Sequence, residues 1–214
     1  LTTVSVSTDS YTQTDLVTFQ GEHFLAQNEL KSDGDLELSF VRDGIQFGTN
    51  NRDYIYGIEV NDEIYALGGD DWLYLSSGDD IIDGGEGYDR LDARSWNEAI
   101  TVDLDAGTIV SNTGDNDQLR NVERIIGTQF DDVLIGGERQ DQVIDVGYSA
   151  TMDSSFTGEG GDDYIEGRGD HDFVWYGRAP EAVQINLSTG IVSGGEGNDT
   201  LVGIEWITGS NYSD

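Results

Sequence analysis

The chain has 214 residues, of which 43 are acidic and 10 basic, so its formal net charge is −33. Such acidity argues against binding to nucleic acid and against direct binding to anionic lipid, because both would be repelled. No run of about 18 apolar residues is present, which argues against a membrane-spanning helix. Without cysteine, disulfides and thiolate metal sites are excluded.

The first 47 residues lack the repeat that dominates the rest of the chain. Apolar residues alternate at Val4 and Val6, and the segment DLELSFVRDGIQFG (35–48) predicts a hairpin that turns at Arg42-Asp43-Gly44. The repeats that follow predict a solenoid, whose open end needs a cap. We therefore expect residues 1–47 to form an N-terminal β cap.

From residue 48 onward, an acidic residue followed two places later by an aliphatic residue recurs every nine residues. Five consecutive pairs are in register: Asp53/Ile55, Asp62/Ile64, Asp71/Leu73, Asp80/Ile82 and Asp89/Leu91. The repeat is written in full as GGEGYDRLD (84–92) and GGEGNDTLV (194–202). Six residues of each unit would form a turn and three a short strand, with the aliphatic side chain pointing inward. Two units then make one 18-residue coil of a parallel solenoid.

The repeat weakens after residue 92 but does not end. Acidic and aliphatic pairs with the same spacing recur later, at Asp132/Leu134 with Asp141/Val143, and at Asp163/Ile165 with Asp172/Val174. Glu98 and Glu181 can replace Asp in the pattern, whereas Gly107/Ile109 and Gly190/Val192 keep its phase without a carboxylate. A longer repeat relates 98–132 to 181–214, and the second copy differs from the first by a deletion of one residue.

These phases divide the chain into four expected parts. Residues 1–47 form the cap, 48–144 a first block with degenerate coils, 145–157 an insertion and 158–214 a second block. The second block stops within a repeat, so we expect the chain to be a fragment of a longer protein.

The negative charge requires counter-ions before such a chain can become compact. A net charge of −33 with only 36% hydrophobic residues opposes collapse. Calcium accepts about six to eight oxygen ligands, including backbone carbonyls, which glycine turns present readily. Zinc is disfavoured because cysteine is absent and His23 and His171 share no motif, and magnesium retains its water. We therefore expect calcium binding to drive folding.

The nonapeptides GGEGYDRLD and GGEGNDTLV resemble those of the RTX (repeats-in-toxin, haemolysin-type calcium-binding) family. The resemblance covers about 48–214, with a gap near 145–157. It implies an all-β fold, a calcium-bound parallel β-roll. It also implies export of the unfolded chain by type I secretion, followed by folding in extracellular calcium.

In this family one calcium ion lies between turns that are two repeat units apart, and it is ligated by carbonyls and one Asp from each turn. Carried onto this chain, the resemblance implies sites at Thr49, Asn51, Asp53, Ala66, Gly68 and Asp71; at Leu67, Gly69, Asp71, Gly84, Glu86 and Asp89; and at Ile58, Val60, Asp62, Leu75, Ser77 and Asp80. Later candidate ligands are Asp132, Asp141, Asp163, Asp172 and Asp199, with Asp117 a weaker one. Counting favourable turn pairs gives about five calcium ions. Where a larger residue such as Leu67 replaces glycine, we expect the turn to avoid positive φ.

Two groups of residues allow other interpretations. The doublets Asp70–Asp71, Asp79–Asp80, Asp131–Asp132 and Asp162–Asp163 could be paired acid/base carboxylates, but adjacent carboxylates in turns are more simply solvated charge, and we expect no catalysis. Tyr54 and Trp72 are separated by two repeat units, as are Tyr56 and Tyr74. They should form a patch on one sheet, either covered by the cap, which we favour, or able to bind sugar rings.

The expected function is that of a secreted calcium-binding module, outside the cell or on its surface. It would be a structural, adhesive or surface-layer element of a larger type I-secreted protein. The alternative is a non-catalytic accessory module, with carbohydrate binding as one option, of a secreted polysaccharide-modifying enzyme, protease or lipase. Expected partners are other domains of the same chain, copies of itself or extracellular polysaccharide.

Overall fold

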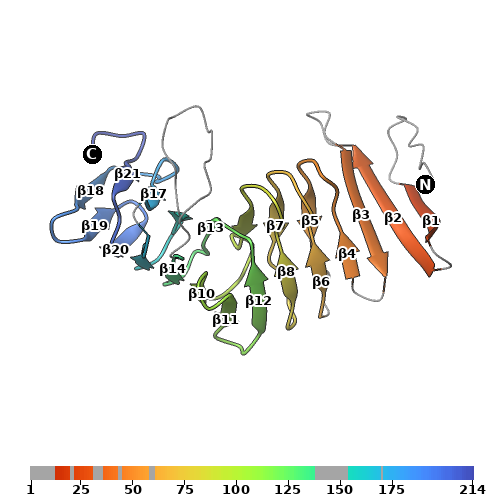
Figure 1. Ribbon diagram of the computed structural model, residues 1–214. Helices are drawn as coiled ribbons and strands as arrows, with labels where there is room; N and C mark the ends of the chain where they lie inside the picture. The colour runs from red at the N-terminus through yellow and green to blue at the C-terminus, as the bar shows by residue number, and fades with distance from the viewer. Residues whose placement is uncertain are drawn as a thin grey trace.

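The computed structural model describes residues 13–19, 22–30, 36–42, 45–57, 61–137, 154–169 and 171–214, and for the strands before residue 45 it describes the backbone alone. These residues form β-strands arranged as an elongated ladder that runs from the N-terminus to the C-terminus (Figure 1). No helix in these ranges has the length and apolar character needed to cross a membrane.

The strands belong to a 14-stranded sheet, here sheet A, and a 7-stranded sheet, here sheet B. Sheet A contains β1 (Gln13–Phe19), β2 (Glu22–Leu30), β3 (Leu36–Arg42), β4 (Ile45–Phe47), β6 (Glu63–Tyr65), β8 (Ile81–Asp83), β12 (Asn116–Arg120), β11 (Thr108–Ser111), β10 (Ile100–Asp103), β14 (Val133–Ile135), β16 (Tyr164–Glu166), β20 (Gly197–Val202), β19 (Ile191–Gly194) and β18 (Val183–Asn186), in that spatial order. Sheet B contains β21 (Trp206–Thr208), β17 (Phe173–Trp175), β15 (Ser155–Thr157), β13 (Arg124–Ile126), β9 (Arg90–Asp92), β7 (Trp72–Tyr74) and β5 (Tyr54–Tyr56).

The predicted coil of two units is confirmed where the repeat is regular. Strand β5 pairs in parallel with β7, with Ile55 opposite Leu73, and β7 pairs with β9 in the same register. In sheet A, Ile64 of β6 lies opposite Ile82 of β8. Each strand has three residues, so six residues remain for each turn. The nine-residue spacing therefore fixes both strand length and register.

The core is a double row of aliphatic side chains between the two sheets. The central residue of each short strand points inward, because strand side chains alternate. Sheet B contributes Ile55, Leu73, Leu91, Ile125, Phe156 and Val174, and sheet A contributes Ile64, Ile82, Leu119, Val102, Leu134, Ile165 and Leu201. Gln46 of β4 stands opposite Ile64 and is also buried. Its side-chain amide donates to the Tyr56 carbonyl at 3.1 Å, so a polar residue closes the row at this end.

Between residues 98 and 120 the structure departs from the expected degenerate parallel coils. Strands β10, β11 and β12 form an antiparallel meander, and only β12 returns to stack in parallel on β8. The physical reason lies in the alternation of Ile100 with Val102 and in the short turn at Gly107, whose φ is 65°. This pattern makes a hairpin, whereas a coil requires a six-residue turn. The phase kept by Gly107 and Ile109 is thus a coincidence of spacing.

The same meander occurs a second time, as the longer sequence repeat indicates. Strands β18, β19 and β20 pair antiparallel, and β20 stacks in parallel on β16. The following strands, β13 and β21, both lie in sheet B. The longer repeat therefore marks a repeated structural unit of meander plus coil.

The predicted hairpin near the N-terminus is present. Strands β3 and β4 pair antiparallel, with Val41 opposite Gln46, and β1 and β2 continue the antiparallel order. Strand β4 then joins β6 in parallel, which attaches this segment to the first coil of sheet A. Val4, Val6 and the turn residues Asp43 and Gly44 lie outside the described residues.

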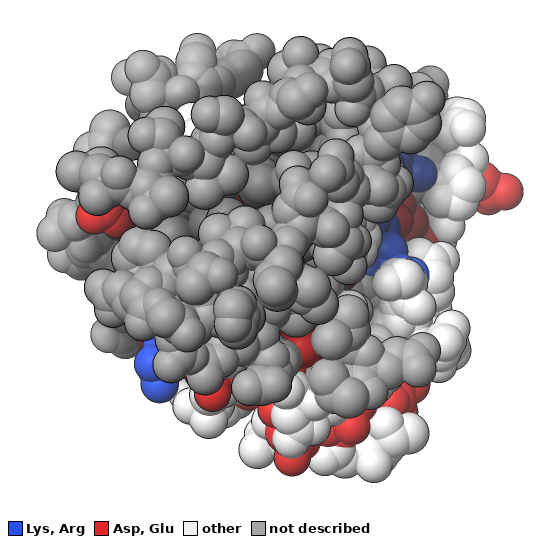
Figure 2. All heavy atoms as spheres, turned by 90° about the vertical axis from the view of Figure 1, so that its right-hand side faces the viewer, with Lys and Arg blue, Asp and Glu red and all other residues white. Residues whose placement is uncertain are grey.

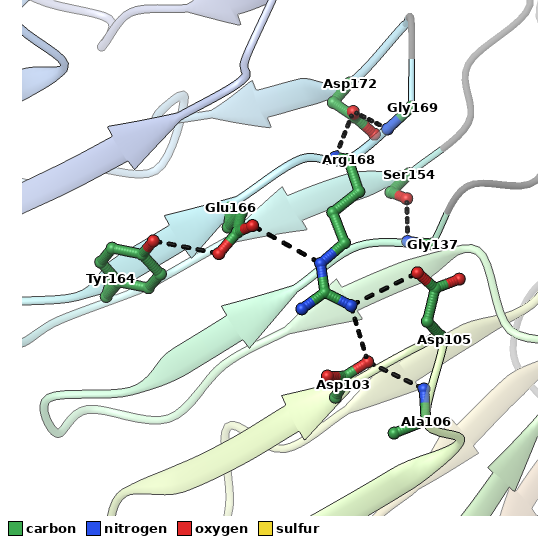
Figure 3. A network of polar contacts seen from close by, with 10 residues as sticks. All are labelled: Asp103, Asp105, Ala106, Gly137, Ser154, Tyr164, Glu166, Arg168, Gly169 and Asp172. Atoms are coloured by element: carbon green, nitrogen blue, oxygen red, sulfur yellow. Dashed lines mark hydrogen bonds and ion pairs between the residues drawn. The ribbon is translucent and has the colours of Figure 1, made fainter.

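Ion pairs on the surface connect the first meander to the later coils. The Arg168 guanidinium lies 3.4 Å from Asp103, the last residue of β10, and 3.3 Å from Asp105 in the β10–β11 turn (Figure 3). Its Nε lies 3.5 Å from Glu166 of β16. Exposed pairs of this kind contribute at most about 1 kcal/mol each, so the aliphatic rows remain the main connection.

Candidate calcium sites

Buried acidic side chains form a hydrogen-bonded ladder along one edge of the roll. The Asp53 N–H donates to Asp71 Oδ1 at 2.7 Å, and the Asp71 N–H donates to Asp89 Oδ1 at 2.8 Å. The Asp89 N–H then donates to Glu123 Oε2 at 2.9 Å. Each carboxylate thus reaches back to the preceding turn, which places one oxygen in the ladder and leaves the other available.

The opposite edge repeats this arrangement and corrects one expectation. The Asp62 N–H donates to Asp80 Oδ1 at 2.8 Å, and the Asp80 N–H donates to Asp117 Oδ1 at 2.9 Å. Asp117, expected to be a weaker candidate, is therefore the successor of Asp80. Glu98 lies outside this ladder and accepts a hydrogen bond from the Thr113 hydroxyl. The meander explains the change, because it moves the next turn of this edge from residue 98 to residue 117.

The later blocks contain a third ladder. The Ile100 N–H donates to Asp132, the Asp132 N–H to Asp163, and the Asp163 N–H to Asp199, at 2.9, 2.9 and 3.1 Å. Strand β10 is in register with β14 so that Ile100, rather than Glu98, precedes Asp132. Val183 similarly donates to Asp214, which leaves Glu181 outside the ladder.

Several buried carboxylate oxygens lack any donor within the described part of the chain. Asp53, Asp71 and Asp89 are at most 1% exposed, yet Asp53 Oδ1, Asp71 Oδ2 and Asp89 Oδ2 accept no hydrogen bond. Burial raises the pKa of Asp71 and of Asp89 to about 7. An ionised carboxylate in this position is unfavourable unless a cation compensates it. These oxygens therefore fit a bound divalent metal.

The turns between these carboxylates bring backbone oxygens together. The Glu86 N–H donates to the Leu67 carbonyl and the Gly69 N–H donates to the Glu86 carbonyl, both at 2.9 Å. A carbonyl oxygen has a second lone pair, so each can still ligate a metal. A Cβ on Gly87 would lie 1.7 Å from the Gly69 carbonyl oxygen, so only glycine allows this approach. Oxygen-rich seams of this kind suit calcium.

The metal cannot be held by side chains alone. No group of three acidic, histidine or cysteine side chains converges anywhere in the described ranges. Two aspartates per site therefore need backbone carbonyls to complete the shell, as the sequence predicts. Acidic side chains crowd the lower part of the end view in Figure 2, where basic ones are few.

Comparison with known protein families agrees with this geometry. The family model of the RTX calcium-binding nonapeptide repeat matches four times, at residues 56–91, 121–143, 153–178 and 191–205. The chain belongs to the RTX repeat family. RTX nonapeptide repeats bind calcium, and the fold described above is the β-roll expected from them.

The chain is similar to a solved structure of an extracellular lipase but matches no curated protein sequence. The crystal structure of extracellular lipase LipA from Serratia marcescens is similar over 77% of this chain, with 16% sequence identity and a TM-score of 0.32. The similar region spans 38% of the length of that lipase.

The RTX turns fall into two classes according to whether a hydroxyl of the same turn donates to the carboxylate. Asp71 and Asp89 have a buried oxygen without a donor. In other turns, a hydroxyl four residues earlier donates to the carboxylate: Thr49 to Asp53, Ser76 to Asp80 and Thr128 to Asp132, each at 2.9 Å. The first class is better prepared for a cation, because a capping donor competes with the metal for the oxygen.

The remaining predicted ligands divide between the seam and its surroundings. Gly68 forms a parallel bridge with Glu86, and Gly84 lies against Asp89. Ala66 and Leu75 are buried at the start of their turns, whereas Asn51 and Ser77 are exposed. Asp172 Oδ2 accepts from the backbone of Arg168 and of Gly169, both at 3.1 Å. Ile58, Val60 and Asp141 lie outside the described residues.

Leu67 contradicts the expectation that larger residues avoid positive φ, because its φ is 76°. The stacked turns impose this conformation, and Gly85 adopts φ 95° at the same position of the next turn on this edge. A non-glycine residue in this region costs about 1–2 kcal/mol.

Replacing Leu67 with glycine should therefore stabilise the calcium-loaded roll by about 1 kcal/mol, since relief of strain exceeds the added freedom of the unfolded chain. Chemical denaturation in saturating calcium measures this. Leu187→Gly is the matched control: both leucines are 47% exposed, but Leu187 does not have positive φ. A loss of stability in Leu67→Gly as large as in the control would contradict the prediction.

Asp199 differs from the other ladder residues in having an aromatic partner. The Tyr176 hydroxyl, buried in the core, donates to Asp199 Oδ2 at 2.5 Å, while Oδ1 accepts from Asp163. No sequence pattern indicates this contact, because the two residues belong to different coils. Asp199 could ligate calcium through Oδ2 only in competition with Tyr176.

Tyr176→Phe should destabilise the calcium-loaded protein by about 2 kcal/mol, because it removes a buried hydrogen bond to a charged group. Tyr164→Phe provides the control, since the Tyr164 hydroxyl donates to Glu166 at 3.0 Å on the surface. The two variants are compared by urea denaturation. Equal stability of both would show that the Tyr176 contact contributes nothing beyond a surface one.

The aspartate doublets have a structural role in the turns. The outer member of each doublet accepts a backbone N–H from the adjacent coil: Tyr88 donates to Asp70 at 3.1 Å, and Asp162 donates to Asp131 at 2.8 Å. The inner member belongs to the buried ladder. Each doublet thus joins adjacent turns twice, once at the surface and once in the buried ladder. These structural contacts account for the adjacent aspartates without acid/base chemistry.

Proposed function

We propose that the chain is an extracellular module that calcium binding folds into a rigid roll. It would serve as a structural or adhesive element of a larger protein, surface-layer assembly included. The observation that carries this proposal is the pair of buried oxygens on Asp71 and Asp89 that accept no hydrogen bond from the described residues. With a net charge of −33, compaction without a cation is strongly opposed. RTX calcium-binding repeats support both the metal and a secreted parent protein.

The proposed sites are the turn pairs that the sequence indicates. The strongest is the seam between turns 66–71 and 84–89, because its carboxylates lack capping hydroxyls. The turn pair of Asp53 with Asp71 and the turn pair of Asp62 with Asp80 would bind calcium more weakly. On the edge that carries Asp62 and Asp80, the next ligand would be Asp117 in place of Glu98. About five ions would remain the expected total, at the millimolar to submillimolar affinity of about 10⁻⁴–10⁻³ M typical of extracellular modules.

Circular dichroism during a calcium titration tests the proposal, with magnesium as the control. Metal-stripped protein should be disordered at neutral pH, and calcium should produce a cooperative β signal that magnesium does not reproduce. A full β signal in excess chelator at neutral pH would overturn the proposal.

A second candidate function, carbohydrate binding in an accessory module, is favoured by the aromatic residues of sheet B. Tyr54 and Trp72 have ring centroids 5.3 Å apart, and Tyr56 and Tyr74 stack with centroids 4.1 Å apart. Tyr56 is 47% exposed, so the end of this patch is accessible. Trp72→Ala and Tyr56→Ala should each weaken sugar binding, and unchanged binding would remove the aromatics from this role.

A further inference from the structure

The outer face of sheet B gathers basic residues in a chain that has very few. Four of the ten basic residues, Arg90, Arg94, Arg124 and Arg178, lie on or beside strands β9, β13 and β17. Arg90 and Arg124 stand directly opposite each other on neighbouring strands. Leu91 and Ile125 fill the core, so the adjacent arginines point to the outer face.

Among the described residues, only two of these four arginines form an ion pair. Arg94 pairs with Asp92 at 2.5 Å, and Arg178 pairs with Glu159 at 3.2 Å. Within the described ranges, Arg90 and Arg124 make neither an ion pair nor a hydrogen bond and instead contact aromatic rings. The Arg90 guanidinium lies 3.7 Å from the Trp72 centroid, and that of Arg124 lies 5.9 Å from the Trp175 centroid. Burial and the neighbouring Arg124 lower the pKa of Arg90 to about 10.

Buried hydrogen-bond donors without an acceptor occur on this same face. Arg90 Nε, Arg124 Nε and Thr157 Oγ1 are buried and have no partner within the described structure, and Thr157 is only 1% exposed. These atoms come from three consecutive strands, β9, β13 and β15. A buried donor left unpaired costs about 1–3 kcal/mol. Two buried guanidinium Nε donors, on arginines that form no ion pair with the described residues, fit a ligand with negatively charged acceptor oxygens.

We propose that the strip formed by Trp72, Arg90, Arg124 and Trp175, hereafter the arginine strip, binds a carboxylated polysaccharide. A guanidinium matches a carboxylate with two parallel hydrogen bonds. The tryptophans hold the guanidiniums by cation–π contact, and the adjoining Tyr56–Tyr74 stack offers a flat apolar face to a sugar ring. This inference depends on the proposed function only in needing the calcium-folded roll.

An acidic peptide fits the strip less well. Strands β9, β13 and β15 lie inside sheet B, with each pairing both its neighbours. Their backbone groups are therefore already used and cannot accept a peptide as an additional strand. A sugar polymer needs only the side chains that this face presents.

The overall charge sets the conditions of the test. The net charge of −33 repels any polyanion at long range, whereas the arginine strip attracts it at short range. At physiological ionic strength the Debye length is about 8 Å, which screens the distant charges and leaves close contacts effective. Binding is therefore measured at physiological salt with saturating calcium.

The experiment is isothermal titration of the full chain with an oligosaccharide of uronic acids. Its carboxyl-reduced, neutral counterpart and an acidic peptide of equal charge serve as alternative ligands. Arg90→Gln with Arg124→Gln should weaken uronate binding at least about tenfold, because both carboxylate contacts are lost. Arg120→Gln removes one charge from an exposed position on β12 of sheet A and should change nothing. Arg90→Lys with Arg124→Lys keeps the charge but should still weaken binding, since a lysine ammonium cannot form the two parallel hydrogen bonds of a guanidinium.

Uronate binding that survives the double glutamine variant, or an absence of binding by the native chain, would overturn the proposal. Equal binding of the neutral sugar, or preference for the acidic peptide, would also overturn it. Circular dichroism of the same samples separates the two proposals: failure of calcium-dependent folding counts against the proposed function, whereas calcium-folded protein that ignores uronate counts against the arginine strip alone. A variant is included only if its melting temperature in saturating calcium equals that of the native chain.

Discussion

Asp71→Asn is expected to raise the calcium concentration needed for folding at least about tenfold, equivalent to about 1.4 kcal/mol. Asp70→Asn, its neighbour in the same turn, should leave that concentration nearly unchanged. The two substitutions are chemically identical and adjacent in sequence. Only their depth differs, because Asp71 is buried in the ladder and Asp70 is exposed.

The asparagine preserves one role of Asp71 and removes the other. Its side-chain oxygen can still accept the Asp53 N–H, which the carboxylate does now at 2.7 Å. It cannot replace the charged oxygen that has no protein donor. Without calcium, a neutral amide avoids the penalty of a buried charge. The variant should therefore be less unstable than the native chain in chelator and less responsive to calcium.

Calcium titrations of the native chain and of the Asp71→Asn, Asp70→Asn and Asp53→Asn variants, followed by circular dichroism, measure the calcium concentration needed for folding. Asp53→Asn should have a smaller effect than Asp71→Asn, because Asp71 would serve two ions and Asp53 only one. Thr49 also donates its hydroxyl to Asp53 at 2.9 Å, so part of that carboxylate is already satisfied. Identical midpoints for the Asp53 and Asp71 variants would contradict a ladder of shared ligands.

The regular coils could be predicted from sequence because each structural rule there is local. A buried aliphatic residue in every repeat unit leaves one possible register, in which Ile55 meets Leu73 and Ile64 meets Ile82. A shift by one residue would expose the whole row. The positions of Asp53, Asp71 and Asp89 on one edge follow from the same rule.

The meanders could not be predicted by counting repeat units. Glu98 and Ile100 keep the spacing of the repeat, but the apolar residues of 100–111 alternate with period two and pair as a hairpin. The coil is then resumed at Asp117 rather than at Glu98. Spacing alone does not distinguish these cases, because the same nine-residue interval occurs in the coils and in the meander.

Contacts between distant coils were also invisible in the sequence. Arg90 and Arg124 are far apart along the chain. They become neighbours because β10, β11 and β12 all belong to sheet A, so that β13 pairs directly with β9 in sheet B. The hydrogen bond from the Tyr176 hydroxyl to Asp199 likewise connects residues on either side of strands β18 and β19 of the second meander. Such pairs have no spacing signature, so both the arginine strip and the capped Asp199 emerge from the structure.

Metal-free protein is expected to gain β structure as the pH falls, the reverse of ordinary acid denaturation. Burial raises the pKa of Asp71 and Asp89 from 3.8 to about 7, and that of Asp163 to about 8. Between pH 4 and 7 the folded state then binds more protons than the unfolded state, so its stability falls as pH rises. The contribution of these groups is fully present below 3.8 and is lost as pH rises through about 7 to 8.

Calcium should reverse the direction of this dependence. A metal-bound carboxylate must be ionised, so protons compete with calcium and affinity should rise with pH across the same window. Circular dichroism in metal-stripped buffer, from pH 8 down to 5, is compared with the same series in saturating calcium. The series stays above the isoelectric point near 4.1, where low net charge promotes precipitation. A metal-free β signal that grows with pH would mean that the buried aspartates are compensated within the protein, and the calcium ladder would lose its physical basis.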